Sequence, residues 1–197
     1  MMQHLAKDLY STRLELKHLE PNMRNAEMIF NVLRNENPDD YKYEPLMMPH
    51  ALPSSVNETL EMMVHYAEFE ADNGCVFYMF HAGQFIGVRK LYFYAPASTL
   101  KFSTVWLVSG ARHRGFAQES FRVIEEIAFN KMKVNRLSRV NIADNADSAA
   151  LARVTGFVLD GISRQAVVLP DGKFYDLMMW SKLYSDYQNE KNAPHVK

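Results

Sequence analysis

The order of apolar and polar residues in the first third of the chain predicts one strand and two helices. Thr12 to Leu19 alternates apolar and polar side chains, which is the period of a half-buried strand. From Pro21, which suits the first turn of a helix, apolar residues recur at helical spacing to about Arg34. Ser54 and Ser55 are suited to cap a second amphipathic helix.

The rest of the chain alternates segments of strand and helix character. Runs rich in β-branched and aromatic residues predict strands, and runs with one apolar face at helical spacing predict helices. The predicted strands are Cys75–His81, Phe85–Tyr94, Thr99–Val108, Leu137–Ala143, Phe157–Leu169 and Phe174–Leu183, and the predicted helices are Phe116–Asn130 and Asp147–Thr155. This order predicts an α/β (α+β) fold, with a mixed sheet of about six to seven strands flanked by about four helices.

The length of the chain fits a single domain. Its 197 residues are too few for two ordinary domains, so we assign residues 1–187 to one domain. Residues 188–197 are polar and are predicted to form a disordered tail. Residues 35–53 are rich in proline and are interpreted as a long loop inside the domain, of a length that is usually functional or mobile.

Composition and charge exclude several classes of protein. The net charge of -1 argues against electrostatic binding of nucleic acid, so no nucleic-acid partner is expected. The single cysteine, Cys75, cannot form an internal disulfide, which fits a reducing compartment. The first residues lack the apolar core of a secretory signal, and no run of about 18 apolar residues is present. We therefore expect a cytoplasmic protein that is not associated with a membrane.

The segment from Val105 to Ser120 carries the most chemical information. An apolar strand ends at Val108, a short turn with two glycines and several basic residues follows, and a helix begins at about Phe116. The start of a helix exposes unpaired N–H groups and a partial positive charge, which suit a phosphate. Gly115 lets the backbone approach such a ligand closely. An ordinary surface turn with arginines remains the alternative, and the motif lacks the endings of a P-loop or a dinucleotide fold.

The same turn carries a resemblance to a known family. Arg112-x-x-Gly115-x-Ala117 is similar to the pyrophosphate loop of the GNAT N-acetyltransferases, and the chain from about residue 10 to 184 resembles their RimJ/RimL-type branch. Further marks of that branch are Thr12-Arg13-Leu14-Glu15-Leu16, Asn145-x-x-Ser148, Gly156-Phe157, Asp160-Gly161, Arg164, Asp171-Gly172 and Asp176. The resemblance implies a GNAT fold with splayed central strands and an acetyl-CoA-dependent transfer to a primary amine.

The resemblance also implies which residues bind acetyl-CoA. Backbone groups of Trp106, Leu107 and Val108 would pair with the pantetheine arm and polarise the acyl carbonyl. The pyrophosphate would be held beside Arg112 by amides of the loop and helix start, namely His113, Arg114, Gly115, Phe116, Ala117 and Gln118. Asn145 would contact the pantetheine arm from the opposite side, although a helix cap or turn residue is the alternative for it.

Candidates for proton transfer are fewer. The resemblance places Ser148 near the CoA sulfur as an acid or proton relay, and a helix cap is the alternative. Relatives can carry a glutamate where Val167 stands here, so the general base is unknown. Glu70, His81 or water could replace it, and positioning of the amine can itself supply much of the rate.

The remaining expectations concern ligands and partners. The histidines show no metal-binding spacing and one cysteine cannot build a cluster, so no metal is expected. The methionines are interpreted mostly as core residues; the alternative for Met47 and Met48 is that, with Tyr41 and Tyr43, they line an adaptable acceptor pocket. The acceptor would be a peptide N-terminus or a small amine, and the protein would be a monomer or homodimer. The alternative function is a CoA-binding protein with little catalysis that acts as a sensor or partner-binding module.

Overall fold

One mixed sheet forms the centre of the molecule. The structure is a computed structural model that describes residues 2–43, 52–71 and 73–193. Eight strands pair in the order β1-β2-β3-β4-β5-β6-β8-β7, and every pairing is antiparallel except that of β5 with β6. The strands are β1 (Leu9–Tyr10), β2 (Glu15–Lys17), β3 (Gly74–His81), β4 (Gln84–Tyr94), β5 (Thr99–Leu107), β6 (Arg136–Ile142), β7 (Val158–Val168) and β8 (Phe174–Leu183).

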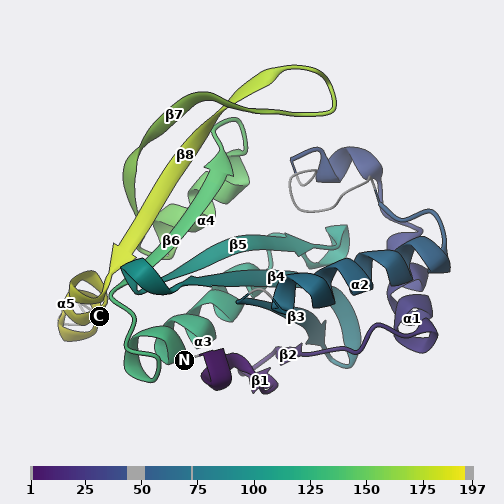
Figure 1. Ribbon diagram of the computed structural model, residues 1–197, viewed down its shortest axis with the longest axis horizontal. Helices are drawn as coiled ribbons and strands as arrows, with labels where there is room; N and C mark the ends of the chain where they lie inside the picture. Colours follow the sequence, from purple (N-terminus) through teal and green to yellow (C-terminus); the bar gives the residue numbers. More distant parts are fainter. Residues whose placement is uncertain (1, 44–51, 72, 194–197) are drawn as a thin grey trace.

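Helices cover both faces of this sheet (Figure 1). They are α1 (Met23–Leu33), α2 (Val56–Ala71), α3 (Phe116–Asn130), α4 (Ala146–Val154) and α5 (Tyr184–Asn192). Tyr66 of α2 contacts Trp106 on one face of β5, and Phe121 of α3 contacts Phe102 on the other face. No helix in the described part of the chain is long and apolar enough to cross a membrane.

The predicted architecture is confirmed, with small differences at the ends. The sheet has one strand more than predicted, because β1 is only two residues long and too short to show a pattern. The strand predicted over Thr12 to Leu19 is paired only at Glu15–Lys17. The additional helix α5 is polar apart from its buried Tyr187, so it lacks the apolar face by which a helix is predicted from sequence. The boundary predicted between residues 187 and 188 therefore lies inside a helix.

The central strands β5 and β6 pair along only part of their length. Their register joins Thr99 through Phe102 to Arg136 through Arg139, and no pairing continues beyond these residues. A bulge shifts the β4–β5 register at this point, because Lys90 opposes Thr104 while Leu91 opposes Phe102. Ser103 is the extra residue, and such a bulge bends a strand and increases its twist. The expected splay is thus present; we call this side of the sheet the open end and the side with paired β5 and β6 the paired end.

Candidate active site

The turn before α3 presents a row of backbone amides without partners. Gly115 is the N-cap of α3, with a left-handed φ of 81° and no side chain to cap the helix. His113 also has a positive φ, of 55°. The backbone N–H groups of residues 113–118 make no hydrogen bond to any residue that the structure describes, and the first helical bond runs from Glu119 N to Gly115 O. Such a set of converging N–H groups at a helix start is suited to bind an anion.

The N-terminal segment holds this turn in place. Arg13 donates from Nη1 to the carbonyl oxygen of Arg114 at 3.1 Å and forms an ion pair with Glu119 through Nη2 at 2.6 Å. Ser11 donates its hydroxyl to the same carboxylate at 2.6 Å. These bonds, together with desolvation that opposes them, leave the pKa of Glu119 below its usual value. The carboxylate in the first turn of α3 therefore stays ionised and is paired with Arg13.

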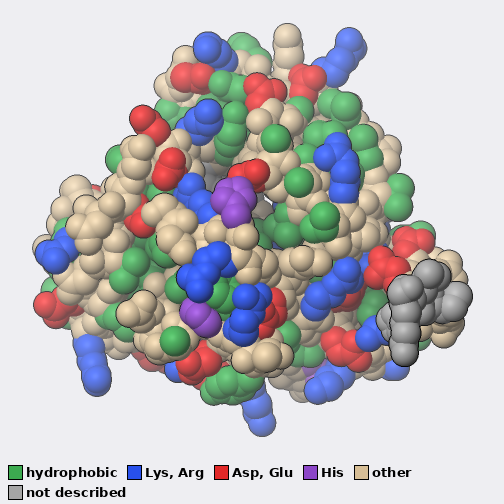
Figure 2. All heavy atoms as spheres, turned by 180° about the vertical axis from the view of Figure 1, so that it is seen from behind, with side chains coloured by type: hydrophobic (Ala, Val, Ile, Leu, Met, Phe, Trp, Pro, Cys, Tyr) green, Lys and Arg blue, Asp and Glu red, His purple; other side chains and the backbone are tan. Residues whose placement is uncertain are grey.

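A large cavity opens beside these amides. It has a volume of about 740 Å³, within the usual range for small-molecule sites. Its wall includes the start of α3, the start of α4 and the short helix η2 (Pro38–Tyr41). Arg112 lies over the ring of Tyr41, at 4.8 Å from its centroid, and His113 reaches Asp147 across the cavity at 3.7 Å. The rear view in Figure 2 shows a hollow on the molecule with charged and histidine side chains around it.

The end of β5 is tied into the protein. Trp106 pairs with Val88 of β4, and its indole nitrogen donates to Tyr66. Leu107 O accepts from Arg112 Nε at 3.0 Å and from the Tyr41 hydroxyl at 3.4 Å. Val108 uses both backbone groups, since its N–H donates to Ile86 O and its carbonyl accepts from Ala111 N. The N–H of Val108 is therefore not available to a ligand, whereas its carbonyl oxygen, which has two lone pairs, accepts only one bond.

Asn145 and Ser148 meet at the start of α4. Asn145 is the N-cap, and its Oδ1 accepts from Ser148 N at 3.0 Å. The capping alternative for Asn145 is thus what the structure shows, and Ser148 does not cap the helix. Ser148 Oγ instead accepts from Arg139 Nη2 at 2.7 Å. Because the oxygen accepts this bond, the hydroxyl hydrogen of Ser148 can point into the cavity that both residues line.

A second, smaller cavity lies between the splayed strands. Its volume is about 320 Å³, and Tyr43, Asn145 and Ser148 line both cavities. Arg89 of β4 lines it and is only 2% exposed. Arg89 donates to Ser120 Oγ and to Ala117 O, both at 2.8 Å from Nη2. Both partners are neutral, and burial together with the nearby Arg139 lowers the pKa of Arg89 to about 9.

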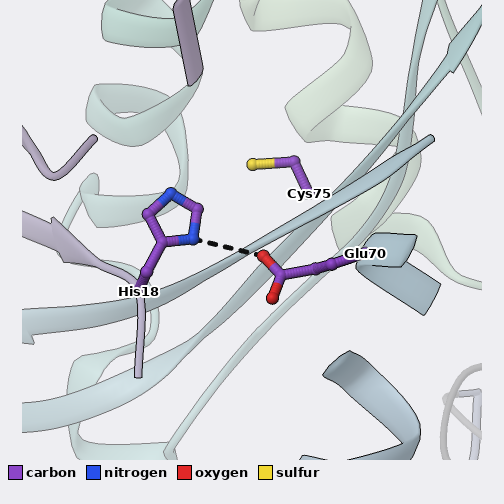
Figure 3. Close-up of side chains that lie close together, drawn as sticks. All are labelled: His18, Glu70 and Cys75. Atoms are coloured by element: carbon purple, nitrogen blue, oxygen red, sulfur yellow. Dashed lines mark hydrogen bonds and ion pairs between the residues drawn. The ribbon is translucent and has the colours of Figure 1, made fainter. Parts of the chain in front are cut away.

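The alternative general bases lie away from these cavities. Glu70 sits at the paired end, where its Oε1 accepts from Val76 N and lies 3.2 Å from His18 Nδ1 (Figure 3). His81 contacts Arg13 O through Nδ1, and its ring packs 4.6 Å from that of Phe116. Neither residue lines either cavity, and Val167 pairs with Tyr175 in the β7–β8 hairpin. The structure therefore offers no support for Glu70 or His81 as the base.

One group of side chains has the composition of a metal site. Ligand atoms of His18, Glu70 and Cys75 lie within 4.8 Å of one another (Figure 3). His18 uses both ring nitrogens, because Nε2 lies 2.9 Å from Leu5 O and Nδ1 faces Glu70. Burial raises the pKa of Cys75 far above its usual value, so the thiol stays protonated. The group is satisfied internally and joins the N-terminus to α2.

The comparison with protein families decides the identity. A model described as an acetyltransferase (GNAT) domain matches residues 13–158, which is well over half of the chain. The chain belongs to the GNAT acetyltransferase family. This GNAT protein is accordingly an acyltransferase enzyme. No curated protein sequence gives a significant match.

Solved structures share its fold. A GCN5-related N-acetyltransferase from Brucella melitensis superposes with a TM-score of 0.81 at 19% identity, covering 95% of this chain and 83% of that chain. The microcin self-immunity acetyltransferase MccE, in complex with acetyl-CoA and AMP, gives 0.73 at 18% identity, covering 88% and 93%. RimL, a ribosomal α-N-protein acetyltransferase in an apo crystal form, gives 0.71 at 18%, covering 88% and 91%. Its presence among them agrees with the RimJ/RimL-type resemblance of the sequence.

Several residues of the site were not predicted from the sequence. Arg89 and Arg139 line the smaller cavity, and Arg13 supports the turn from 101 positions away. Tyr41 and Tyr43 line the larger cavity, while Met47 and Met48 lie outside the described residues. The adjacent cations Arg89 and Lys90 inside an apolar strand were the one available signal, because charged residues are almost never fully buried without a reason.

Proposed function

We propose that this GNAT protein transfers the acetyl group of acetyl-CoA to a primary amine. The observation that carries the proposal is the row of unpartnered amides at residues 113–118, which opens onto a cavity of about 740 Å³. A pyrophosphate at this position would satisfy these amides and meet Arg112 and His113. The pantetheine arm would then run along the cavity toward Ser148, past the end of β5.

The chemistry that follows needs only a few groups. The neutral amine attacks the thioester carbon, the C–N bond forms and the C–S bond breaks, and the products are an amide and CoA. The amine loses one proton to water, and the sulfur takes one proton from Ser148, which water restores. Arg139 favours this transfer because its guanidinium stabilises negative charge on the Ser148 oxygen. Holding the amine against the thioester supplies the rest of the rate enhancement.

A second candidate function is a CoA-binding protein with little catalysis. It is favoured by one observation: no carboxylate among the described residues lines the smaller cavity between β5 and β6, where a general base would be expected. Both candidates predict binding of acetyl-CoA. Only the enzyme predicts that CoA is released when an amine is added.

The test has two stages. Acetyl-CoA should raise the melting temperature, as any ligand selective for the folded state must. A thiol-release assay over peptides with free N-termini, amino acids, polyamines and aminoglycosides should then show turnover with one class. Stabilisation without turnover across all four classes would favour the CoA-binding protein, and absence of stabilisation would refute both.

A further inference from the structure

The cavity between the splayed strands is lined by cationic side chains and, among the described residues, by no anionic one. Arg89, Lys101 and Arg139 line it, and none of its described lining residues is an aspartate or glutamate. The larger cavity differs, since Asp39, Asp40, Asp144 and Asp147 all lie in its wall. The cations of the smaller cavity would therefore attract an anionic ligand group.

Arg89 is the central residue of this cavity. A fully buried guanidinium is costly unless an anion compensates it. Within the described part of the chain, Arg89 has no carboxylate partner; its bonds reach a hydroxyl and a backbone carbonyl, and the like charge of Arg139 acts on it unfavourably. The buried Arg89 thus leaves room for a negative charge that none of the described residues lining the cavity provides.

We propose that the cavity between β5 and β6 binds the carboxylate of a small amino acid, whose amine is the acetyl acceptor. This rests on the proposed function, and it narrows the acceptor to amines that carry a carboxylate a few bonds away. The volume of about 320 Å³ suits a small molecule. Ser148 borders both cavities and bonds to Arg139, so a carboxylate near the arginines keeps its amine close to the reacting thioester.

The decisive experiment compares each amino acid with its own amide. Glycine, L-serine and L-tyrosine are tested against glycinamide, L-serinamide and L-tyrosinamide in the thiol-release assay. At neutral pH the amides have more unprotonated amine, so a preference for the acids must come from the protein. We expect kcat/KM to be higher for the acid than for its amide with at least one pair.

Arg89→Met should remove that preference. We expect kcat/KM for the acid to fall about 10- to 100-fold while that for the amide changes little, because a hydrogen bond to a charged group is lost. The fold should tolerate the change, since Ser120 Oγ still donates to Ala117 O. Lys90→Met is the matched control: Lys90 is the adjacent buried cation, lies over the rings of Tyr66 and Phe69, and lines neither cavity.

Equal use of acids and amides by the wild type overturns the proposal, as does a preference that survives in Arg89→Met. If Arg89→Met lowers kcat/KM equally for acids and amides, the proposal is also overturned, because the guanidinium would then act on the leaving thiolate and not on the carboxylate of the acceptor.

A binding measurement separates this inference from the proposed function. N-acetyl-L-serine should raise the melting temperature of the wild type more than N-acetyl-L-serinamide does, and Arg89→Met should abolish the difference. This readout needs no turnover. If acetyl-CoA fails to bind while N-acetyl-L-serine still stabilises the wild type selectively, the proposed function fails and the anion site stands. If acetyl-CoA binds while N-acetyl-L-serine and its amide stabilise the wild type equally, the anion site alone is refuted.

Discussion

Lys182 of β8 and Arg89 of β4 are both buried cations, yet their surroundings differ. Lys182 is fully buried at the paired end of the sheet, where Nζ lies 2.7 Å from Glu125 and 2.6 Å from Glu190. Arg89 lies at the open end with neutral partners and a second arginine nearby. A buried charge that is paired belongs to the fold, whereas one that is unpaired next to a cavity indicates a ligand.

Other groups at the two ends follow the same division. At the open end, the amides of residues 113–118 lack partners in the described structure. At the paired end, His18 and Glu70 bond to each other and to backbone groups. Substitutions at the paired end should therefore lower stability, and those at the open end should lower binding or rate.

The largest effect is expected from Lys182→Met. Removing the ammonium leaves Glu125 buried with only Arg122 beside it, so the free energy of unfolding should fall by about 3 kcal/mol. Chemical denaturation measures this change. The double variant Lys182→Met with Glu125→Leu should recover most of the loss, because no charge is then left unpaired. A single variant as stable as the wild type would show that the ion pair is not structural.

Gly115→Glu should act on the ligand instead. It places a carboxylate among the unpartnered amides, and we expect acetyl-CoA affinity to fall about 100-fold, or about 2.7 kcal/mol. Isothermal titration calorimetry gives the affinity directly. Gly83→Glu is the matched control, because Gly83 has a similar φ of 76° against 81° and lies in the β3–β4 turn. Equal affinity of the two variants for acetyl-CoA would show that the pyrophosphate does not bind at this helix start.

Ser148→Ala tests the proton path at the same end. We expect kcat to fall about 10- to 100-fold, at the low side of general acid catalysis because water can replace the hydroxyl. The affinity for acetyl-CoA should change little, since the helix cap is Asn145. Ser163→Ala, which removes a hydroxyl from β7 outside both cavities, is the control. A kcat equal to that of the wild type would exclude Ser148 as the acid.

The open and paired ends also differ in how far the sequence predicts them. Local patterns were enough for strands β2 to β8, for α3 and for the turn at Gly115, because alternation, helical spacing and glycine act over a few residues. The splay depends on one bulged residue, Ser103, and the sequence pattern of the strand does not predict a bulge there. It was expected from family resemblance rather than from the residues.

Long-range contacts were the part that the sequence could not provide. Arg13 and Glu119 are 106 positions apart, and their pairing depends on how β2 meets α3. The same holds for Arg89, which points to α3 while its neighbour Lys90 points to α2. A strand pattern shows that two adjacent residues face opposite sides, but not which side has a cavity. The anion site therefore emerged only from the three-dimensional arrangement.

The smallest effect is expected from His18 at the paired end. Its bond to Glu70 raises the pKa of His18 above its ordinary value of 6.5 in the folded protein, although burial opposes the shift. The pair should therefore stabilise the fold fully below pH 6.5 and lose this contribution as the pH rises through the raised pKa. The contribution of the His18–Glu70 pair to the free energy of unfolding should stay below about 1 kcal/mol, because both side chains are partly exposed. Melting temperatures of the wild type and His18→Gln, measured from pH 5.5 to 8.5, should differ most at the acidic end. His65→Gln, at an exposed site on α2, corrects for the loss of one histidine. A difference that grows toward pH 8.5 would mean that His18 is neutral in the fold, and that the paired end is held together by something other than this ion pair.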